Sequence, residues 1–430
     1  MDCDVVVVGA GLAGLRCAER LGGAGRAVVL LDAGDAVGGR ARTDTVDGFL
    51  LDRGFQVLNP AYPAVRRWVD VPALHLHAFG AGVLVRRDRG LVELSHPVRH
   101  PSGILRTVRS GLVTPAAVAA LARWAGPAVV TPRRVVGGAD RPLRAGLDRA
   151  GVRGPLRAEV LEPFLAGVLA EDRGETSDAF TRLLVRMFAL GVPGLPERGI
   201  RALPEQLADR ARRSGAEVRL GEPVVSVRGP ASGRGGEASV ELAGGGVLSA
   251  RAAVVAVGPE AVGGLVDVAT PRTKGLQTWW FAADEAPTSS TMLAVDGRRR
   301  GPVVNTAVVS NAVPSYAPPG RHLVQVTCLL ATRAERAASG SQGEATLEAE
   351  VRRQAGEIYG VDARPWQVVR HDEITHALPA QPPPLRTTSP ARLDDGVYVC
   401  GDHRDTASIQ GALVSGNRVG DAVLADLGRS

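Results

Sequence analysis

The six residues from 9 to 14 read GAGLAG, with the spacing GxGxxG, directly after the apolar run Val5–Val8. In such a turn the first glycine permits the tight bend, and the second lets the backbone approach a pyrophosphate. The third, Gly14, allows the helix that follows to pack closely on the strand. The free N–H groups and positive dipole end of that helix attract phosphates. The motif therefore predicts a dinucleotide site.

Asp32 strengthens this prediction through its place in the chain. The amphipathic stretch Leu12–Leu21 is followed by a second apolar run, Ala27–Leu31, and Asp32 comes directly after it. An acidic residue about 20 residues beyond the glycines is expected to accept hydrogen bonds from the adenosine ribose. The start of the chain thus predicts a strand–helix–strand unit, which does not by itself distinguish FAD from NAD.

Four further segments narrow the choice of cofactor. Residues 38–43 read GGRART, in which two arginines offer guanidinium groups suited to diphosphate oxygens, and residues 51–56 read LDRGFQ. Near the other end, residues 398–403 read YVCGDH and residues 410–416 read QGALVSG. Together these segments resemble the flavin-containing amine oxidase superfamily, which includes monoamine oxidases, protoporphyrinogen oxidases and phytoene-type desaturases.

The resemblance implies which residues hold FAD. The arginine turn would contact the cofactor, the LDRGFQ segment would lie near the flavin, and Asp402 would accept a hydrogen bond from the ribityl chain. Backbone N–H groups of Gln410–Ala412 would face the flavin pyrimidine edge and favour negative charge on the reduced ring. Val225 would lie by the adenine. The predicted FAD-binding residues are Gly9, Gly11, Leu12, Ala13, Gly14, Asp32, Ala33, Gly39, Arg40, Arg42, Gly54, Phe55, Val225, Val257, Gly258, Gly401, Asp402, Gln410, Gly411 and Ala412.

Amine oxidases of this superfamily usually place a lysine near flavin N5 and an aromatic cage in front of the ring. The single lysine, Lys274, comes before Gln277, near which the superfamily lysine would align, and Ser408 stands at a cage position. Amine oxidation therefore becomes a secondary alternative. No cysteine occupies residues 375–390, where covalent attachment would be expected, so the resemblance implies noncovalent FAD.

Without the cage, the expected site is an open, largely apolar channel over the flavin. Gln277, Trp279 and Phe281 would share one face of a strand and are candidate walls, whereas core packing is the favoured role for either aromatic ring taken alone. Ser408 and His403 complete the substrate-pocket candidates. No acid–base pair stands out, which suits a reaction in which the flavin carries the hydride chemistry.

The sequence thus predicts an FAD-dependent oxidoreductase, an oxidase or desaturase, that removes a hydride from a hydrophobic small molecule. Because only one dinucleotide motif is present, oxygen or a quinone is expected to reoxidise the flavin. Three alternatives stay open: a protoporphyrinogen oxidase-like enzyme, an amine oxidase, and a non-catalytic escort protein that binds FAD or lipid.

The pattern of apolar runs predicts an α/β fold with a discontinuous Rossmann-type FAD-binding domain and an inserted α+β substrate-binding domain. Residues 1–69, 194–268 and 392–430 are assigned to the first domain, and residues 70–193 and 269–391 to the second.

Two helices and a hairpin are also predicted. Ile104–Trp124 has an apolar-basic helix pattern, which would either belong to the substrate domain or dip into a membrane surface as a peripheral contact. A charged helix is predicted over Ala331–Ile358, and a glycine-rich hairpin over Gly229–Gly236.

Composition limits the partners and the compartment. The formal charge of +6 is spread among interleaved basic and acidic residues, which does not favour a nucleic-acid partner. Four well-separated cysteines without a CxxC pair indicate a reducing cytoplasm. His75 and His77 would share a strand face but lack a third ligand, so no metal site is predicted. None of these patterns predicts an oligomeric state.

Overall fold

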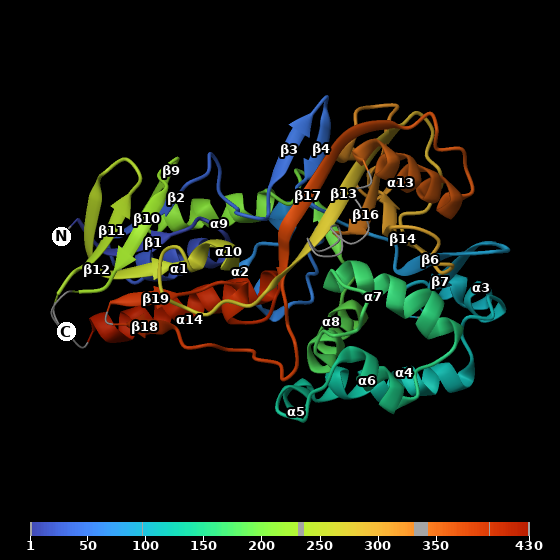
Figure 1. The fold of residues 1–430 in the computed structure, drawn as a ribbon, viewed down its shortest axis with the longest axis horizontal. Helices are drawn as coiled ribbons and strands as arrows, with labels where there is room; N and C mark the ends of the chain where they lie inside the picture. Colours follow the sequence, from blue (N-terminus) through green and yellow to red (C-terminus); the bar gives the residue numbers. More distant parts are fainter. Residues whose placement is uncertain (1, 97, 231–235, 331–342, 395, 429–430) are drawn as a thin grey trace.

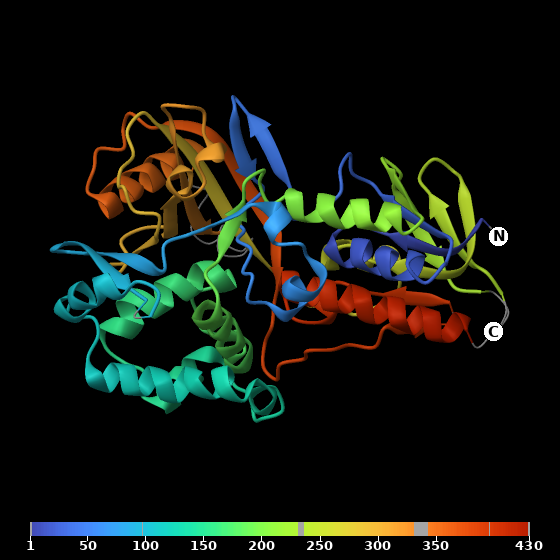
Figure 2. The ribbon, with the colours of Figure 1, turned by 180° about the vertical axis from the view of Figure 1, so that it is seen from behind.

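The computed structural model describes residues 2–96, 98–230, 236–330, 343–394 and 396–428. The chain forms two lobes (Figures 1 and 2). One lobe holds both ends of the chain and an eight-stranded sheet, and the other holds a seven-stranded sheet with a group of helices below it in Figure 1. The predicted α/β architecture is confirmed.

The secondary structure has the following bounds. The strands are β1 (Cys3–Val8), β2 (Val28–Asp32), β3 (Thr43–Val46), β4 (Phe49–Asp52), β5 (Leu76–Ala78), β6 (Gly82–Arg87), β7 (Gly90–Ser95), β8 (Gly194–Pro196), β9 (Ala216–Leu220), β10 (Val224–Arg228), β11 (Ala238–Leu242), β12 (Val247–Val255), β13 (Thr273–Ala283), β14 (Leu293–Asp296), β15 (Val303–Val308), β16 (His322–Leu329), β17 (Gln367–Pro379), β18 (Arg392–Asp394) and β19 (Val397–Val399). The α-helices are α1 (Leu12–Gly22), α2 (Pro63–Trp68), α3 (Ile104–Arg109), α4 (Pro115–Val130), α5 (Pro132–Val136), α6 (Leu143–Ala150), α7 (Glu162–Leu169), α8 (Asp178–Leu190), α9 (Ala202–Arg213), α10 (Pro259–Val262), α11 (Val309–Ala312), α13 (Glu344–Tyr359) and α14 (Ile409–Leu427). The short helical turns are η1 (Pro72–Leu74), η2 (Pro101–Gly103), η3 (Leu156–Leu161), η4 (Pro314–Tyr316) and η5 (Asp402–Arg404).

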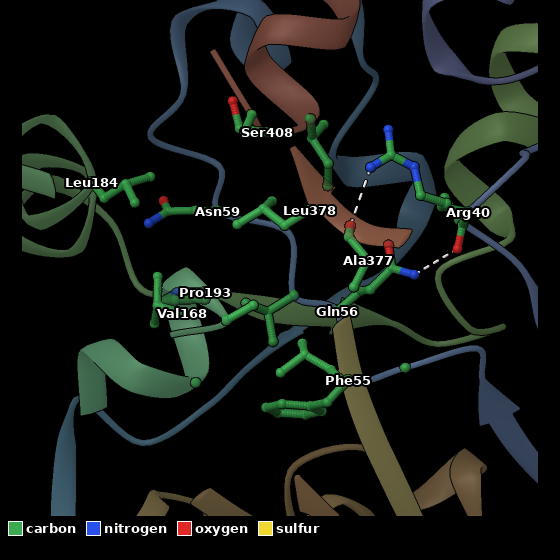
Figure 3. A pocket seen from close by; sticks show the side chains of 18 of the residues that line it. Arg40, Phe55, Gln56, Asn59, Val168, Leu184, Pro193, Ala377, Leu378 and Ser408 are labelled. Atoms are coloured by element: carbon green, nitrogen blue, oxygen red, sulfur yellow. Dashed lines mark hydrogen bonds between the residues drawn. The ribbon is translucent and has the colours of Figure 1, made fainter. Parts of the chain in front are cut away.

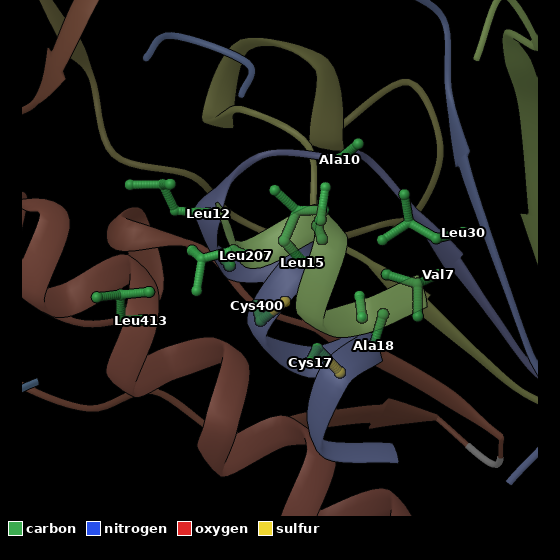
Figure 4. Close-up of a cluster of buried hydrophobic side chains, with 14 of the residues drawn as sticks. Val7, Ala10, Leu12, Leu15, Cys17, Ala18, Leu30, Leu207, Cys400 and Leu413 are labelled. Atoms are coloured by element: carbon green, nitrogen blue, oxygen red, sulfur yellow. The ribbon is translucent and has the colours of Figure 1, made fainter. Parts of the chain in front are cut away.

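The first sheet has the strand order β10-β11-β12-β1-β2-β9, with β19 beside the second half of β12 and β18 beyond it. Strands β19, β12, β1, β2 and β9 run parallel, so their carboxyl ends meet at one edge, where such sheets bind ligands. The valine run of β1 is explained by its burial on both faces. Figure 4 shows Leu15, Leu207 and Leu413, from α1, α9 and α14, meeting beside Cys17 and Cys400 in the core. The predicted strand–helix–strand unit is confirmed.

The second sheet has the order β17-β13-β16-β15-β14-β6-β7 and is antiparallel except where β14 pairs with β6. Its strands come from residues 82–95 and 273–379, whereas those of the first sheet come from residues 3–32, 216–255 and 392–399. The domain boundaries themselves stay a prediction. Helix α13 covers one face of the second sheet through a shared apolar cluster.

The predicted single helix over Ile104–Trp124 is wrong. The chain forms α3 and α4, separated by Gly111 in the left-handed region (φ 70°), and the Thr114 hydroxyl caps α4 by accepting the Ala117 N–H. No helix in the described ranges combines the length and apolar character needed to cross a bilayer.

Two other predicted elements fall partly outside the described residues. Of the charged helix over Ala331–Ile358, residues 331–342 lie outside, and α13 accounts for the remainder from Glu344 onwards. Of the hairpin over Gly229–Gly236, residues 231–235 lie outside.

The Asp52 carboxyl, at the end of β4, joins three segments of the chain. One oxygen accepts hydrogen bonds from the Thr43 hydroxyl (2.6 Å) and the Ile200 N–H (3.1 Å), and the other accepts one from the Tyr316 hydroxyl (2.9 Å). The residue is 1% exposed, and this burial raises the pKa of Asp52 to about 6 although the three hydrogen bonds oppose the shift.

We expect Asp52→Asn to gain stability over the wild type as the pH rises. The pKa of Asp52 is about 6 in the folded chain against 3.8 ordinarily, so the carboxyl's contribution is full below pH 3.8 and is lost as the pH rises through about 6. Asparagine keeps the shape and carries no charge, so the difference in free energy of unfolding between variant and wild type should grow to about 3 kcal/mol by pH 7. Denaturant unfolding at several pH values measures it, and a difference that does not change with pH would contradict the assignment.

Candidate functional site

One cavity of about 1120 Å³ extends from the glycine turn after β1 to helices α7 and α8. Its lining comes from both lobes and from the beginning, middle and end of the chain. Pockets for single small molecules usually have volumes of about 300–1,000 Å³. The cavity therefore has room for a dinucleotide together with part of a second molecule.

The glycine turn shapes one end of this cavity. A Cβ on Gly9 would lie 2.8 Å from the Ala256 carbonyl oxygen, and one on Gly14 would lie 1.9 Å from the Gly9 carbonyl oxygen. By contrast, a Cβ on Gly11 would have no atom within 4 Å, and Gly11 lines the cavity. Gly9 and Gly14 are thus required for packing, whereas Gly11 leaves free space that suits a pyrophosphate.

Asp32 lines the cavity and also organises the turn. One carboxylate oxygen accepts the Ala10 N–H (2.6 Å), and the other accepts the Gly34 N–H (2.8 Å). A carboxylate has about four acceptor sites, so both oxygens can still accept bonds from ribose hydroxyls.

Arg40 and Asp402 form an ion pair in the cavity wall. An Arg40 Nη2 atom lies 2.6 Å from an Asp402 oxygen, and Nη1 donates to the Ala377 carbonyl (3.1 Å; Figure 3). The Arg40 carbonyl in turn accepts from the Gln56 amide (2.6 Å). The sequence placed the arginine and the carboxylate at different parts of FAD, and the structure instead brings the two side chains into direct contact.

The first turn of α14 differs from the prediction for Gln410–Ala412. The Ser408 hydroxyl caps the helix by accepting the Gly411 N–H (3.1 Å), and the Ser408 carbonyl accepts the Ala412 N–H (3.0 Å). The Gln410 side chain points to α2, where it accepts the Ala64 N–H (2.8 Å). Two of the three N–H groups expected to face a flavin are therefore bonded within the helix.

The predicted FAD-binding residues divide into two groups. Those that line the cavity are Gly9, Gly11, Leu12, Ala13, Asp32, Gly39, Arg40, Gly54, Phe55, Val257, Gly258, Gly401, Asp402 and Ala412. Those outside the lining are Gly14, Ala33, Arg42, Val225, Gln410 and Gly411. Arg42 pairs instead with Asp35 (2.7 Å), and Val225 lies 48% exposed on β10, at the edge of the sheet.

Gln277, Trp279 and Phe281 do not line the cavity, and the two aromatic rings have the core-packing role instead of the candidate wall role. Gln277, Trp279 and Phe281 do share one face of β13, but that face packs against α13, and the Trp279 ring stacks on His371 at 3.7 Å between centroids. Leu276, on the opposite face, lines the cavity. Strand alternation predicts which side chains share a face but not which face meets the cavity.

Of the remaining substrate-pocket candidates, Ser408 lines the cavity and His403 does not. His403 is 7% exposed, neither ring nitrogen has a hydrogen-bond partner in the described part of the chain, and burial lowers its pKa to about 4. The ring lies over Gly401, where a Cβ would be 2.5 Å from it. His403 is therefore neutral near pH 7, and its ring packs against Gly401 outside the cavity lining.

An apolar arm, missed by sequence reasoning, forms the far end of the cavity. Its walls are helical side chains, and Figure 3 shows Val168 and Leu184 directed into the same space as Phe55, Pro193 and Leu378. We define the arm by Val160, Leu161, Phe164, Val168, Leu184, Met187 and Phe188. The only signal for these residues is helical apolar spacing, which does not distinguish a pocket wall from core.

Asn305 adds a polar group to this largely apolar region. It is 5% exposed and lines the cavity, and its Oδ1 atom has no hydrogen-bond partner among the described residues. Its register partner on β16, Thr327, also lines the cavity. Because a buried unsatisfied amide is costly, Asn305 is suited to bind a polar group of a ligand.

Lys274 has a structural role outside the cavity lining. Its ammonium donates to the Thr176 hydroxyl (2.6 Å) and the Leu169 carbonyl (3.2 Å), which ties β13 to the loop after α7. It is the single lysine of the sequence, so the lysine that amine oxidases place near the flavin has no counterpart in this cavity.

The chain matches a family described as flavin-containing amine oxidoreductases over residues 12–424. Putrescine oxidase of Kocuria rosea is 51% identical over 70 residues, which are 16% of this chain and 15% of that protein. L-amino-acid oxidase of Bungarus fasciatus is 44% identical over 77 residues, which are 17% of this chain and 15% of that protein. The chain thus matches less than a fifth of the length of these relatives.

Solved structures share the whole fold at low sequence identity. An oxidoreductase of Methanosarcina mazei superimposes with a TM-score of 0.75 at 19% identity, over 97% of this chain and 100% of that one. A protein of Exiguobacterium sp. 255-15, provisionally named protoporphyrinogen oxidase, gives 0.70 at 18% identity over 99% of both chains. The match over nearly its full length shows that the chain belongs to the flavin-containing amine oxidoreductase family.

Proposed function

We propose that this chain is an FAD-dependent oxidoreductase that removes a hydride from a hydrophobic small molecule. One observation carries the proposal: a single cavity joins the glycine turn after β1 to the apolar arm on α7 and α8. A cofactor bound at the turn and a substrate in the arm would meet inside one cavity. Oxygen or a quinone would then reoxidise the cofactor.

The residues at the turn fit FAD. Gly11 leaves open space for the pyrophosphate, and Asp32 has free acceptor sites for the adenosine ribose. When bound, the flavin ring supplies the acceptor for the hydride. The four cysteines are free and buried, and none lines the cavity, which supports noncovalent binding and a reducing cytoplasm as the location.

The protein's own residues would bind, orient and shield the substrate. The apolar arm excludes water from the reacting carbon, and its helical residues include no carboxylate or imidazole. The Asn305 amide would fix the orientation of the substrate by bonding one polar group. This division of labour suits hydride removal, in which the protein mainly positions the substrate.

Amine oxidation is the second candidate, favoured by the local similarity to putrescine oxidase. Two observations oppose amine oxidation. Lys274 forms its hydrogen bonds outside the cavity lining, and Ser408 lines the cavity at a position where an aromatic cage residue would be expected. A protoporphyrinogen oxidase-like activity is a third hypothesis, supported by the shared fold with the protein from Exiguobacterium.

We expect Gly11→Val to fold but lose FAD and Gly14→Val to lose the fold. The Gly11 side chain would enter open space that the pyrophosphate needs, whereas the Gly14 side chain would meet backbone. Flavin absorbance after gel filtration should fall at least about tenfold in Gly11→Val, with the circular dichroism of the wild type retained. Full flavin content in Gly11→Val would contradict the assignment of the pyrophosphate site.

Anaerobic bleaching of the flavin tests the proposed reaction. Apolar candidates bearing one hydroxyl or carbonyl group should reduce the flavin, and air or a quinone should restore its colour. Asn305→Leu should weaken the binding of such substrates about tenfold, because one hydrogen bond is lost at similar volume. A different result would favour the hypothesis of a non-catalytic escort protein over that of an enzyme. In that result photoreduced flavin reoxidises in air, no apolar candidate reduces the flavin, and the protein binds lipid tightly. Bleaching by primary amines alone would favour amine oxidation.

A further inference from the structure

Exposed apolar side chains gather on and just before α3. Val98 is 81% exposed, Ile104 41%, Leu105 58% and Val108 61%, and no residue of α3 is buried. Single exposed apolar residues are ordinary on a protein surface, whereas four close together in the chain indicate an interaction surface. We name these four residues the α3 patch.

Three arginines lie in the same stretch of chain as the α3 patch. Arg99 and Arg109 are exposed, and Arg106 is 73% exposed with its guanidinium 3.1 Å from Glu93. Glu93 also accepts from the Ser95 hydroxyl and lies 3.5 Å from His100, so its charge is shared among these groups. The patch therefore combines an apolar face with excess positive charge.

Helix α3 is fixed with this face outward. The Thr107 hydroxyl accepts the Ser95 N–H of β7 (2.9 Å), and the Ser110 carbonyl accepts from Arg87 of β6 (2.9 Å). In Figure 1, α3 lies at the outer end of its lobe, far from both ends of the chain. The outward orientation is thus built into the hairpin that carries the helix.

The cavity reaches the surface beside this patch. Ser95, His96 and the exposed Arg99 line the same cavity as the apolar arm. Phe164 of the apolar arm lines the same cavity as Arg99, so the arm and this part of the surface belong to one continuous space.

We propose that the α3 patch docks on the surface of an anionic lipid bilayer and sets this opening of the cavity against it. The apolar side chains would enter the interface between headgroups and acyl chains, and the arginines would bind lipid phosphates. An anionic membrane is the partner that offers both an apolar layer and dense negative charge in one surface. Direct passage of substrate from the membrane rests on the proposed function, whereas the docking itself does not.

Vesicle sedimentation with the FAD-loaded protein tests the docking without any turnover. The wild type should sediment with vesicles of phosphatidylcholine and phosphatidylserine and much less with phosphatidylcholine alone. The double variant Leu105→Glu, Val108→Glu should partition at least about tenfold more weakly, and Arg109→Glu about fivefold. The matched control is Val247→Glu, since Val247 is also 58% exposed but lies in the hairpin at the other end of the molecule.

Three results would overturn the proposal. In the first, the wild type stays in solution with anionic vesicles. In the second, the double variant binds as the wild type does, and in the third, Val247→Glu loses as much binding as the double variant. If the wild type does not bind vesicles, light scattering gives its oligomeric state. A dimer that the double variant no longer forms would assign the α3 patch to contact between copies of this chain. Flavin content and bleaching, measured alongside, keep this outcome separate from failure of the proposed reaction.

Discussion

The close approach of α1 to the ends of β1 and β12 is the constraint on which the rest of the structure depends. Gly14 allows it, because any Cβ there would overlap the Gly9 carbonyl. Gly416 likewise allows α14 to approach α1 closely, because a Cβ there would lie 2.1 Å from the Ala13 carbonyl oxygen. With α1 and α14 packed this tightly, the N-termini of both helices line the cavity, and residues from opposite ends of the chain share one wall.

The second lobe completes the site by adding an apolar arm to this cofactor end. Arg40 connects the parts, because it bonds both Asp402 after β19 and Ala377 on β17, a strand of the other sheet. The nucleotide end of the cavity is built from backbone and a few charged groups, and the far end from helical side chains. This contrast is the basis for our proposal that a polar cofactor and an apolar substrate meet in this cavity.

Local rules determine what the sequence could predict. The glycine spacing and Asp32 act within a single strand–helix–strand unit, so their placement followed from the residues alone. Strand alternation placed Gln277, Trp279 and Phe281 on one face, but it left open whether that face met the cavity or the core, because tertiary packing decides this. The arm around Phe164 and the Asn305 Oδ1 atom, which has no hydrogen-bond partner among the described residues, arise from contacts between distant segments, for which one sequence carries no local signal.

A crystal structure of the FAD-loaded protein would show whether the cofactor leaves the apolar arm free for a substrate. We predict the pyrophosphate against Gly11, the ribose at Asp32, and the flavin ring between Phe55 and the first turn of α14, with the apolar arm still open beyond the ring. An FAD molecule that fills the arm, or a flavin ring that points away from Phe164 and Val168, would contradict it.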